Sequence, residues 1–111
     1  MPKIETIDLA KARTAPQAKV YSGRDRGTFW REKFEVDSAD EQSEPVKVLI
    51  PTDIISVNIS FFLGLFGKSV RQLGREEFSR HYVFECEPIL RQLIEQGITQ
   101  ALKRSNALGE T

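Results

Sequence analysis

The sequence contains few of the residues that build disulfide frameworks and small metal sites. Among its 111 residues there is one cysteine, Cys86, and one histidine, His81. A lone cysteine cannot close an intramolecular disulfide, and one cysteine with one histidine cannot supply the ligands of a structural zinc site. These shortages argue against a disulfide-stapled secreted fold and a zinc module. We therefore expect a reducing, cytoplasmic location, with no metal and no cofactor.

Net charge and long apolar runs are missing as well. Sixteen Lys and Arg balance sixteen Asp and Glu, so the chain lacks the overall positive charge typical of nucleic-acid-binding proteins. Residues 1–20 contain no apolar run of signal-peptide length. The most apolar segment, Ile54–Leu73, is interrupted by polar residues, and its continuous part is shorter than the roughly 18 residues of a membrane span. We expect no contact with nucleic acid or with a membrane.

The charges that are present are unevenly distributed. Residues 1–33 contain eight basic and four acidic residues, whereas residues 34–53 contain six acidic residues and one basic residue, Lys47. Within the acidic part, residues 37–45 offer almost no apolar side chain to bury, so we predict an exposed loop. A docking site for a basic partner is the alternative, and nothing in the composition selects it.

Apolar periodicity predicts a small sheet and several helices. The run Val46–Ile50 is rich in β-branched residues and stops at Pro51, which is typical of a buried strand at the centre of a sheet. Weaker strand signals occur at Ile4–Leu9 and at Tyr82–Phe84. Between Asp25 and about Val36, three aromatic residues recur at helical spacing and predict a helix with its aromatic stripe in the core. They are Phe29, Trp30 and Phe34.

The C-terminal half predicts three further helices. Ile54–Leu73 predicts a largely buried helix, capped by Asn58 or Ser60 and ended by Gly74 in a left-handed turn. A short helix follows over residues 75–81, and a long amphipathic helix begins at Pro88. The order strand-helix-strand-helix-strand-helix predicts an α/β fold with a small central sheet flanked by helices. We assign residues 1–105 to one domain and residues 106–111 to a flexible tail.

Two stretches of the chain resemble a known family. Residues 7–11, 21–27 and 29–33 resemble the opening strand, the Gly/Arg loop and the first helix of the STAS-like domains of unknown function, which are relatives of the anti-sigma-factor antagonists. The segment Ser-Phe-Phe-Leu-Gly-Leu-Phe-Gly, residues 60–67, resembles the family's Ser-Phe-led helix. The resemblance implies a bacterial, non-catalytic regulatory domain that contacts a protein partner. In this family the partner is often a histidine-kinase-like ATPase.

Some polar residues of the family pattern are replaced here. The family's central strand commonly ends in acidic residues and its Ser-Phe helix commonly carries a Glu pair, whereas this chain has Ile50-Pro51 and Leu63-Gly64. Related anti-sigma-factor antagonists carry a phosphorylated serine at the start of that helix, and Ile59 stands at the corresponding position. The hydroxyl of Ser60, one residue later, serves either as a phosphoacceptor or as a helix cap, and the cap is the favoured interpretation.

The aromatic helix is our first candidate for a binding surface. Its apolar side chains surround almost the whole circumference, which is more apolar area than one small sheet can cover, and its glycines would let another backbone approach. Excess exposed apolar surface marks a contact with a protein partner or a homodimer. The alternative is that the first and last helices complete its burial. The predicted partner-binding residues are Asn58, Ser60, Phe61, Phe62, Gly64, Leu65 and Gly67.

The loop over residues 22–28 is a second candidate, for an anion such as a phosphate or a nucleotide. Two guanidinium groups and flexible glycine backbone meet the positive end of a helix there. The loop lacks the P-loop pattern, and the alternative is a plain helix start whose arginines pair with nearby acids. The predicted anion-binding residues are Ser22, Arg24, Arg26 and Thr28.

The sequence offers little support for catalysis. Ser79 and His81 stand two residues apart, so on a helix they would point to different faces, and no serine lies in a Gly-x-Ser-x-Gly elbow. Cys86 precedes the last helix, where a helix dipole could lower its thiol pKa, but a buried structural thiol is the favoured interpretation. We expect no catalytic residue and no enzymatic activity.

Overall fold

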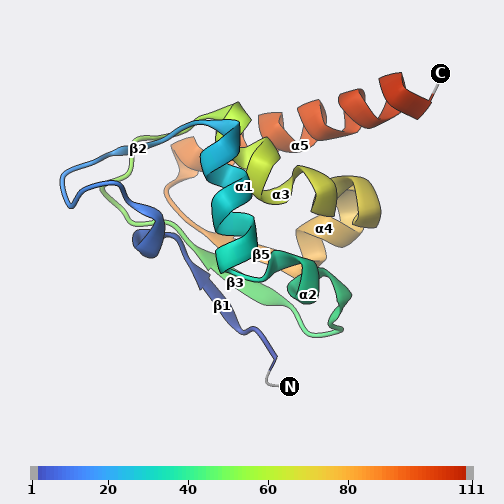
Figure 1. Cartoon of the computed structure of the whole chain (residues 1–111), viewed down its shortest axis with the longest axis horizontal. Coiled ribbons are helices and arrows are strands. Elements are labelled where there is room, and N and C mark those ends of the chain that lie inside the picture. The colour runs from blue at the N-terminus through green and yellow to red at the C-terminus, as the bar shows by residue number, and fades with distance from the viewer. Residues whose placement is uncertain (1–2, 110–111) are drawn as a thin grey trace.

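Three short parallel strands form the main sheet of the molecule (Figure 1). The structure is a computed structural model that describes residues 3–109, with side chains described for residues 3–103. Strand β1 (Thr6–Asp8) and strand β5 (Tyr82–Glu85) lie on either side of β3 (Val46–Leu49). The central position predicted for the β-branched run is thus confirmed.

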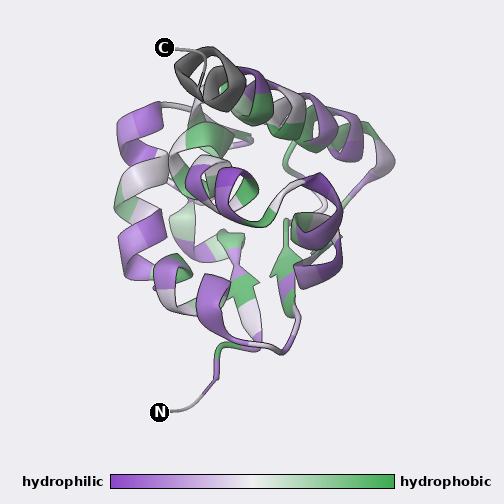
Figure 2. Cartoon of the chain, turned by 90° about the vertical axis from the view of Figure 1, so that its right-hand side faces the viewer, coloured by the Kyte–Doolittle hydropathy of each residue, from purple (hydrophilic) through white to green (hydrophobic). Residues whose placement is uncertain are grey.

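The helices lie against one face of this sheet. Alternate side chains of the strands are buried on that face, among them Ile7, Val48 and Phe84, which are paired across the sheet. The opposite face presents Lys47 and Glu85 to solvent, with their charged groups 3.6 Å apart. Figure 2 shows hydrophobic segments in the strands and hydrophilic segments on the outer turns of the helices. The predicted α/β class is confirmed, with helices flanking the sheet on one side.

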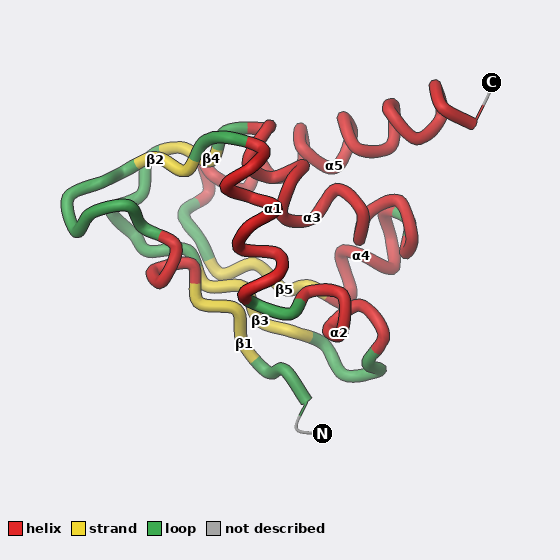
Figure 3. Tube along the Cα trace, in the orientation of Figure 1, coloured by secondary structure: helices red, strands yellow, loops and turns green. Residues whose placement is uncertain are grey.

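A second pair of strands sets the arrangement of two helices. Strand β2 (Val20–Tyr21) pairs in parallel with β4 (Ser56–Val57), and the two lie next to each other in Figure 3. Helix α1 (Arg24–Lys33) begins shortly after β2, and helix α3 (Ile59–Leu73) begins shortly after β4. Because the two strands run in the same direction, the two helices leave them side by side.

The acidic segment is not the exposed loop that we predicted. After α1 ends, Glu35 adopts a left-handed conformation with a φ of 56°, and helix α2 (Val36–Glu41) follows. Val36 and Ala39 of α2 are fully buried. Helix α1 accordingly ends at Lys33, before the predicted end near Val36. The local sequence is a poor helix former, so this helix depends on contacts with the rest of the fold.

Helix α3 is shorter than predicted at its N-terminal end. It begins at Ile59, because Ser56–Val57 pairs with a distant strand, and the side chain of Asn58 caps it by accepting from the Ser60 N–H at 3.0 Å. Asn58 is therefore the cap, in agreement with one of the two predictions. Gly74 ends the helix with a φ of 82°, a positive value as predicted, and helix α4 (Arg75–His81) follows.

The last helix, α5, spans Pro88–Gly109 and begins at the predicted proline. Gly97 brings it close to α3, since a Cβ atom there would lie 2.5 Å from the ring of Phe62. The helix continues past Ser105 to Gly109, and residues 110–111 lie outside the described part of the chain. The flexible tail predicted over residues 106–111 stays a prediction. In the part of the chain that the structure describes, no helix has both the length and the apolar composition of a membrane span.

The core is aromatic, but its aromatic residues are not those predicted on α1. The rings of Phe66, Phe78, Tyr82 and Phe84 contact one another between the helices and the sheet. Phe29 of α1 is 51% exposed, whereas Trp30 of α1 and Phe34, the residue that follows the helix, are partly buried. The predicted burial is therefore wrong for Phe29, whereas Trp30 and Phe34 pack against the edge of the core. Helix α1 instead buries the face that carries Gly27 and Arg31, because that face lies against α3.

Candidate functional site

Helices α1 and α3 cross with their backbones in contact. A Cβ atom built on Gly27 would lie 2.2 Å from the carbonyl oxygen of Phe61, and one built on Gly64 would lie 2.2 Å from that of Arg24. Neither position can hold a larger residue without a shift of the backbone. Gly64 therefore does allow another backbone to approach, as predicted, but that backbone is α1 of the same chain.

A basic groove lies beside this crossing. It has a volume of about 390 Å³, and we call it the α1–α3 groove. Both helices contribute residues at the same spacing, i, i+4 and i+7, which places each set on one helix face. From α1 these are Arg24, Thr28 and Arg31, and from α3 they are Gly64, Lys68 and Arg71, with Leu63 completing the lining.

The end of the groove nearest the start of α1 carries a positive charge that has no internal counter-ion. Arg24 is exposed, and its side chain makes no hydrogen bond or ion pair with the residues that the structure describes. Thr28 lies one helical turn further along and contributes an exposed hydroxyl. A guanidinium and a hydroxyl are the groups that commonly bind phosphate or carboxylate oxygens in proteins.

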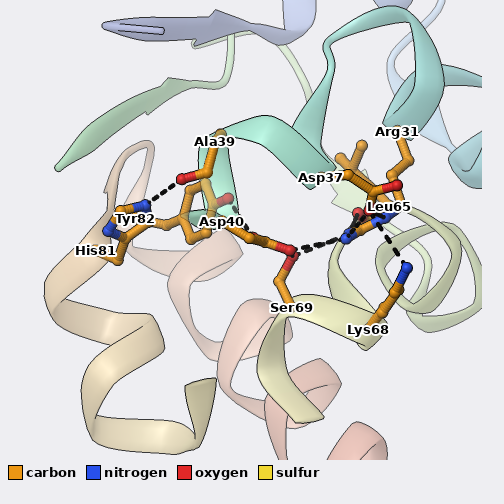
Figure 4. Close-up of polar contacts among 9 residues, drawn as sticks. All are labelled: Arg31, Asp37, Ala39, Asp40, Leu65, Lys68, Ser69, His81 and Tyr82. Atoms are coloured by element: carbon orange, nitrogen blue, oxygen red, sulfur yellow. Dashed lines mark hydrogen bonds and ion pairs between the residues drawn. The ribbon is translucent and has the colours of Figure 1, made fainter. Parts of the chain in front are cut away.

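At the other end of the groove, two of the lining cations already have acids of α2 as counter-ions. The guanidinium of Arg31 is buried and donates to Asp37 Oδ1 at 2.7 Å and to Asp40 Oδ2 at 2.8 Å (Figure 4). It also donates to the Leu65 carbonyl at 2.9 Å. Lys68 Nζ lies 3.6 Å from Asp37 Oδ1. The Arg31 guanidinium lowers the pKa of Asp37, and Lys68 adds to this effect.

Asp40 connects the groove to the interior. Besides Arg31, it accepts hydrogen bonds from the hydroxyls of Ser69 and Tyr82 (Figure 4). Burial, followed by the neighbouring Asp40 carboxylate, raises the pKa of Tyr82. His81 Nε2 lies 2.6 Å from the Ala39 carbonyl oxygen, which ties α2 to α4. These polar groups form hydrogen bonds with one another, and the contacts of Asp40 and Ala39 join α2 to its neighbours. We therefore assign them the role of holding α2 in place.

The structure does not support the premise of the predicted partner-binding surface. We expected the apolar side chains of α3 to exceed what a small chain can cover, yet helices α1 and α5 and strand β5 bury them. Gly67 is also buried, beneath Leu63 and the guanidinium of Arg71. Asn58 is exposed, and Ser60 and Gly64 are partly so. The predicted residues that are buried within the monomer are Phe61, Phe62, Leu65 and Gly67.

Only part of the predicted anion site comes together. Arg24 and Thr28 line the α1–α3 groove, whereas Ser22 and Arg26 are exposed outside it. Sequence reasoning missed Lys68 and Arg71 on α3. Gly64, Lys68 and Arg71 have the same i, i+4, i+7 spacing as the residues of α1 that line the groove. The sequence does not show, however, that α1 and α3 lie side by side.

A larger hollow lies between α2 and the N-terminal segment, with a volume of about 720 Å³. Its charged lining residues are Lys3 and three glutamates, and it does not gather cations around a hydroxyl. No cluster of three or more His, Cys, Asp or Glu suited to a metal ion occurs in the described part of the chain. The lining residues are Lys3, Ile4, Glu35, Ser38, Glu41, Gln42 and Glu44.

The residues considered for catalysis are not arranged as a reactive group. Ser79 is exposed, whereas His81 is buried against Ala39. Cys86 is partly buried, and this burial raises the pKa of its thiol, which disfavours the reactive thiolate.

Comparison with known proteins identifies no family and no function for this chain. A scan of protein-family models finds no match for the chain, and searches of curated proteins and of solved structures find none either.

Proposed function

We propose that this protein is a non-catalytic regulatory module, and that the α1–α3 groove binds an anionic group of its partner. The observation that supports this proposal is Arg24, an exposed cation without an internal counter-ion at the open end of a basic groove. A concave surface with uncompensated positive charge attracts anions, and a guanidinium can form paired hydrogen bonds with a carboxylate or a phosphate.

The resemblance to STAS-like domains suggests what carries the anionic group. It implies a protein partner of the histidine-kinase-like ATPase class, in which the group would be an acidic or phosphorylated side chain. The apolar face of α3, which the sequence favoured as the contact surface, is buried and does not form the contact in this proposal. The residues of α3 that line the groove are Leu63, Gly64, Lys68 and Arg71, and none of them is a buried phenylalanine of that helix.

A free phosphate or nucleotide is the second candidate for the bound anion. Its supporting observation is that Arg24 and Thr28, two residues of the predicted anion loop, line the same groove. The groove is large enough for such a ligand.

Titration with defined anions tests the proposal. We expect inorganic phosphate, ATP or a short poly-glutamate peptide to raise the melting temperature of the protein by about 5 °C at ten times the Kd. The substitution Arg24→Gln should weaken binding by roughly tenfold, since it removes a charged hydrogen-bond donor. Arg26→Gln is the matched control, because Arg26 is an exposed arginine of the same helix that does not line the groove.

The outcomes separate the candidates. Binding of the peptide alone supports a protein partner, and preferential binding of ATP or phosphate supports the free ligand. If none of these probes binds, or if Arg26→Gln weakens binding as much as Arg24→Gln, the groove is not an anion site and the proposal is wrong.

A cross-linking experiment tests the protein partner directly. A photoreactive amino acid at Thr28 should cross-link a protein in the cells that encode this chain, and the same group at Thr14, an exposed loop position outside the groove, should not. Identification of an ATPase in the Thr28 product would support the class implied by the resemblance. Equal products from both positions would contradict a partner contact at the groove.

A further inference from the structure

We infer that Asp37 determines which anions the α1–α3 groove accepts. It acts as a built-in counter-ion at the Arg31 and Lys68 end, and it weakens the binding of a ligand that places a second anionic group beside it, relative to a ligand with one group at the Arg24 and Thr28 end. This inference rests on the proposed function, because it concerns the selectivity of the same groove.

The contacts of Asp37 place a fixed negative charge beside two of the groove's cations. Its Oδ1 atom accepts from Arg31 Nε at 3.1 Å and from Arg31 Nη2 at 2.7 Å, and it lies 3.6 Å from Lys68 Nζ (Figure 4). Both cations line the groove. The side chain of Asp37 is nevertheless 69% exposed, so it lies at the surface beside these two cations and not in the core.

Residues before and after Asp37 in the sequence fix its position. The left-handed turn at Glu35 directs the chain into α2, and the buried side chains of Val36 and Ala39 fix that helix. Asp40, three residues after Asp37, is anchored by Arg31, Ser69 and Tyr82. Asp40 alone can neutralise the buried Arg31, which leaves Asp37 available for a role at the surface.

Helix geometry gives the spacing on which selectivity depends. Thr28 and Arg31 are three residues apart on α1, about 4.5 Å along the helix axis. A ligand with a second anionic group, bound with its first group at Thr28, would therefore bring the second group close to Asp37. Like charges at such a distance repel each other. A single group beside Arg24 lies about 10 Å from Arg31 along the axis, where salt screens most of this repulsion.

Comparison of two anions of different length tests the inference. The dissociation constants of inorganic phosphate and pyrophosphate are measured by calorimetry at constant ionic strength, for the wild type and for Asp37→Asn. We expect Asp37→Asn to raise the affinity for pyrophosphate about fivefold relative to phosphate, because one repulsive contact is removed. Glu41→Gln is the matched control, since it removes the same charge from an exposed position of α2 that lines the other hollow.

Each outcome has a separate meaning. If the wild type binds phosphate and the affinity ratio is the same for Asp37→Asn and Glu41→Gln, the inference about Asp37 is overturned and the proposed function stands. If no variant binds either anion, the inference about Asp37 is overturned, and the peptide titration described above then decides the proposed function. Should Asp37→Asn not fold, Asp37→Ser replaces it, because serine keeps a hydrogen-bond acceptor for Arg31 and removes the charge; the same ratio then decides.

Discussion

Arg24 and Arg31 are the same residue type on the same helix face, and their surroundings give them different roles. Arg31 is buried and donates to two carboxylates, a carbonyl and a hydroxyl, so it holds α1, α2 and α3 together. Arg24 is exposed and has no such partners among the described residues. A buried guanidinium without its acids would be very costly, whereas an exposed one is hydrated and available to a ligand.

The two acids that face Arg31 should differ strongly in their contribution to stability. Asp40 has a side chain that is 4% exposed, and its replacement by Asn leaves the Arg31 charge only partly neutralised in the interior. We expect Asp40→Asn to lower the free energy of unfolding by about 3–5 kcal/mol. Asp37→Asn, at the surface end of the same guanidinium, should cost about 0–1 kcal/mol.

Urea denaturation of both variants checks this expectation. Equal losses for the two substitutions would mean that Asp37 is as important to the fold as Asp40. The role assigned to Asp37 as a selective counter-ion would then lack its structural basis.

At the scale of elements, the groove exists because α1 and α3 run side by side from paired strands. The β2–β4 pairing sets their starting points, and the contact at Gly27 and Gly64 sets their separation. The lining residues recur at the same spacing on both helices, and they therefore form one row on each side of the groove. If the helices moved apart, the cations would no longer surround one space.

A pair of alanine substitutions on α3 tests the importance of this crossing. Gly64→Ala places a Cβ atom against the α1 backbone, and we expect a loss of about 3 kcal/mol or more, because the backbone cannot move aside cheaply. At Gly67 the nearest atom is the end of the Arg71 side chain, at 3.4 Å. Gly67→Ala should therefore be neutral or stabilise the protein by up to about 1 kcal/mol, through its better helix propensity.

Thermal and urea unfolding of the two variants provide the measurement. A strong destabilisation by Gly67→Ala, or a harmless Gly64→Ala, would show that the helices do not cross as described.

At the scale of the whole molecule, both tyrosines of the chain are buried at separate places in the core. The Tyr21 hydroxyl donates to the Leu9 carbonyl, and the Tyr82 hydroxyl donates to Asp40. Burial is the main cause of the shift in each case: it raises the pKa of Tyr21 to about 12, and it also raises the pKa of Tyr82 above its ordinary value. The unfolded chain ionises its tyrosines near the ordinary value of 10.0.

The protein should therefore lose stability in alkali. A raised folded-state pKa for an acid means that the native state keeps its proton when the unfolded state releases it. This stabilising contribution is complete below pH 10 and declines as the pH rises through the folded-state pKa values. We expect tyrosinate absorbance and the loss of helical circular dichroism to develop together on titration. Tyrosinate absorbance at unchanged helicity would show that the tyrosines are accessible in the native state.

Particular elements show how far sequence reasoning reaches. Strand β3 and helix α5 were predictable because each has a strong local pattern, a β-branched run in one case and a long amphipathic repeat in the other. Helix α2 was not, because its stability depends on burial of Val36 and Ala39 and on the anchoring of Asp40 by distant residues. Strands of two residues, such as β2 and β4, carry no periodic signal at all.

The candidate site divides in the same way. Arg24 and Thr28 were predictable, because a glycine and arginine loop before a helix is a local feature. Lys68 and Arg71 were not, because they join the groove only through the pairing of α1 with α3.

The sequence by itself determined the α/β class, the central strand and the last helix, because hydrophobic periodicity is a local property of the chain. Only the tertiary structure decided that the aromatic residues of α3 are covered, that Gly64 contacts α1, and that Asp37 lies beside Arg31 and Lys68. These outcomes depend on segments far apart in the chain meeting in space. No pattern within a single segment contains that information.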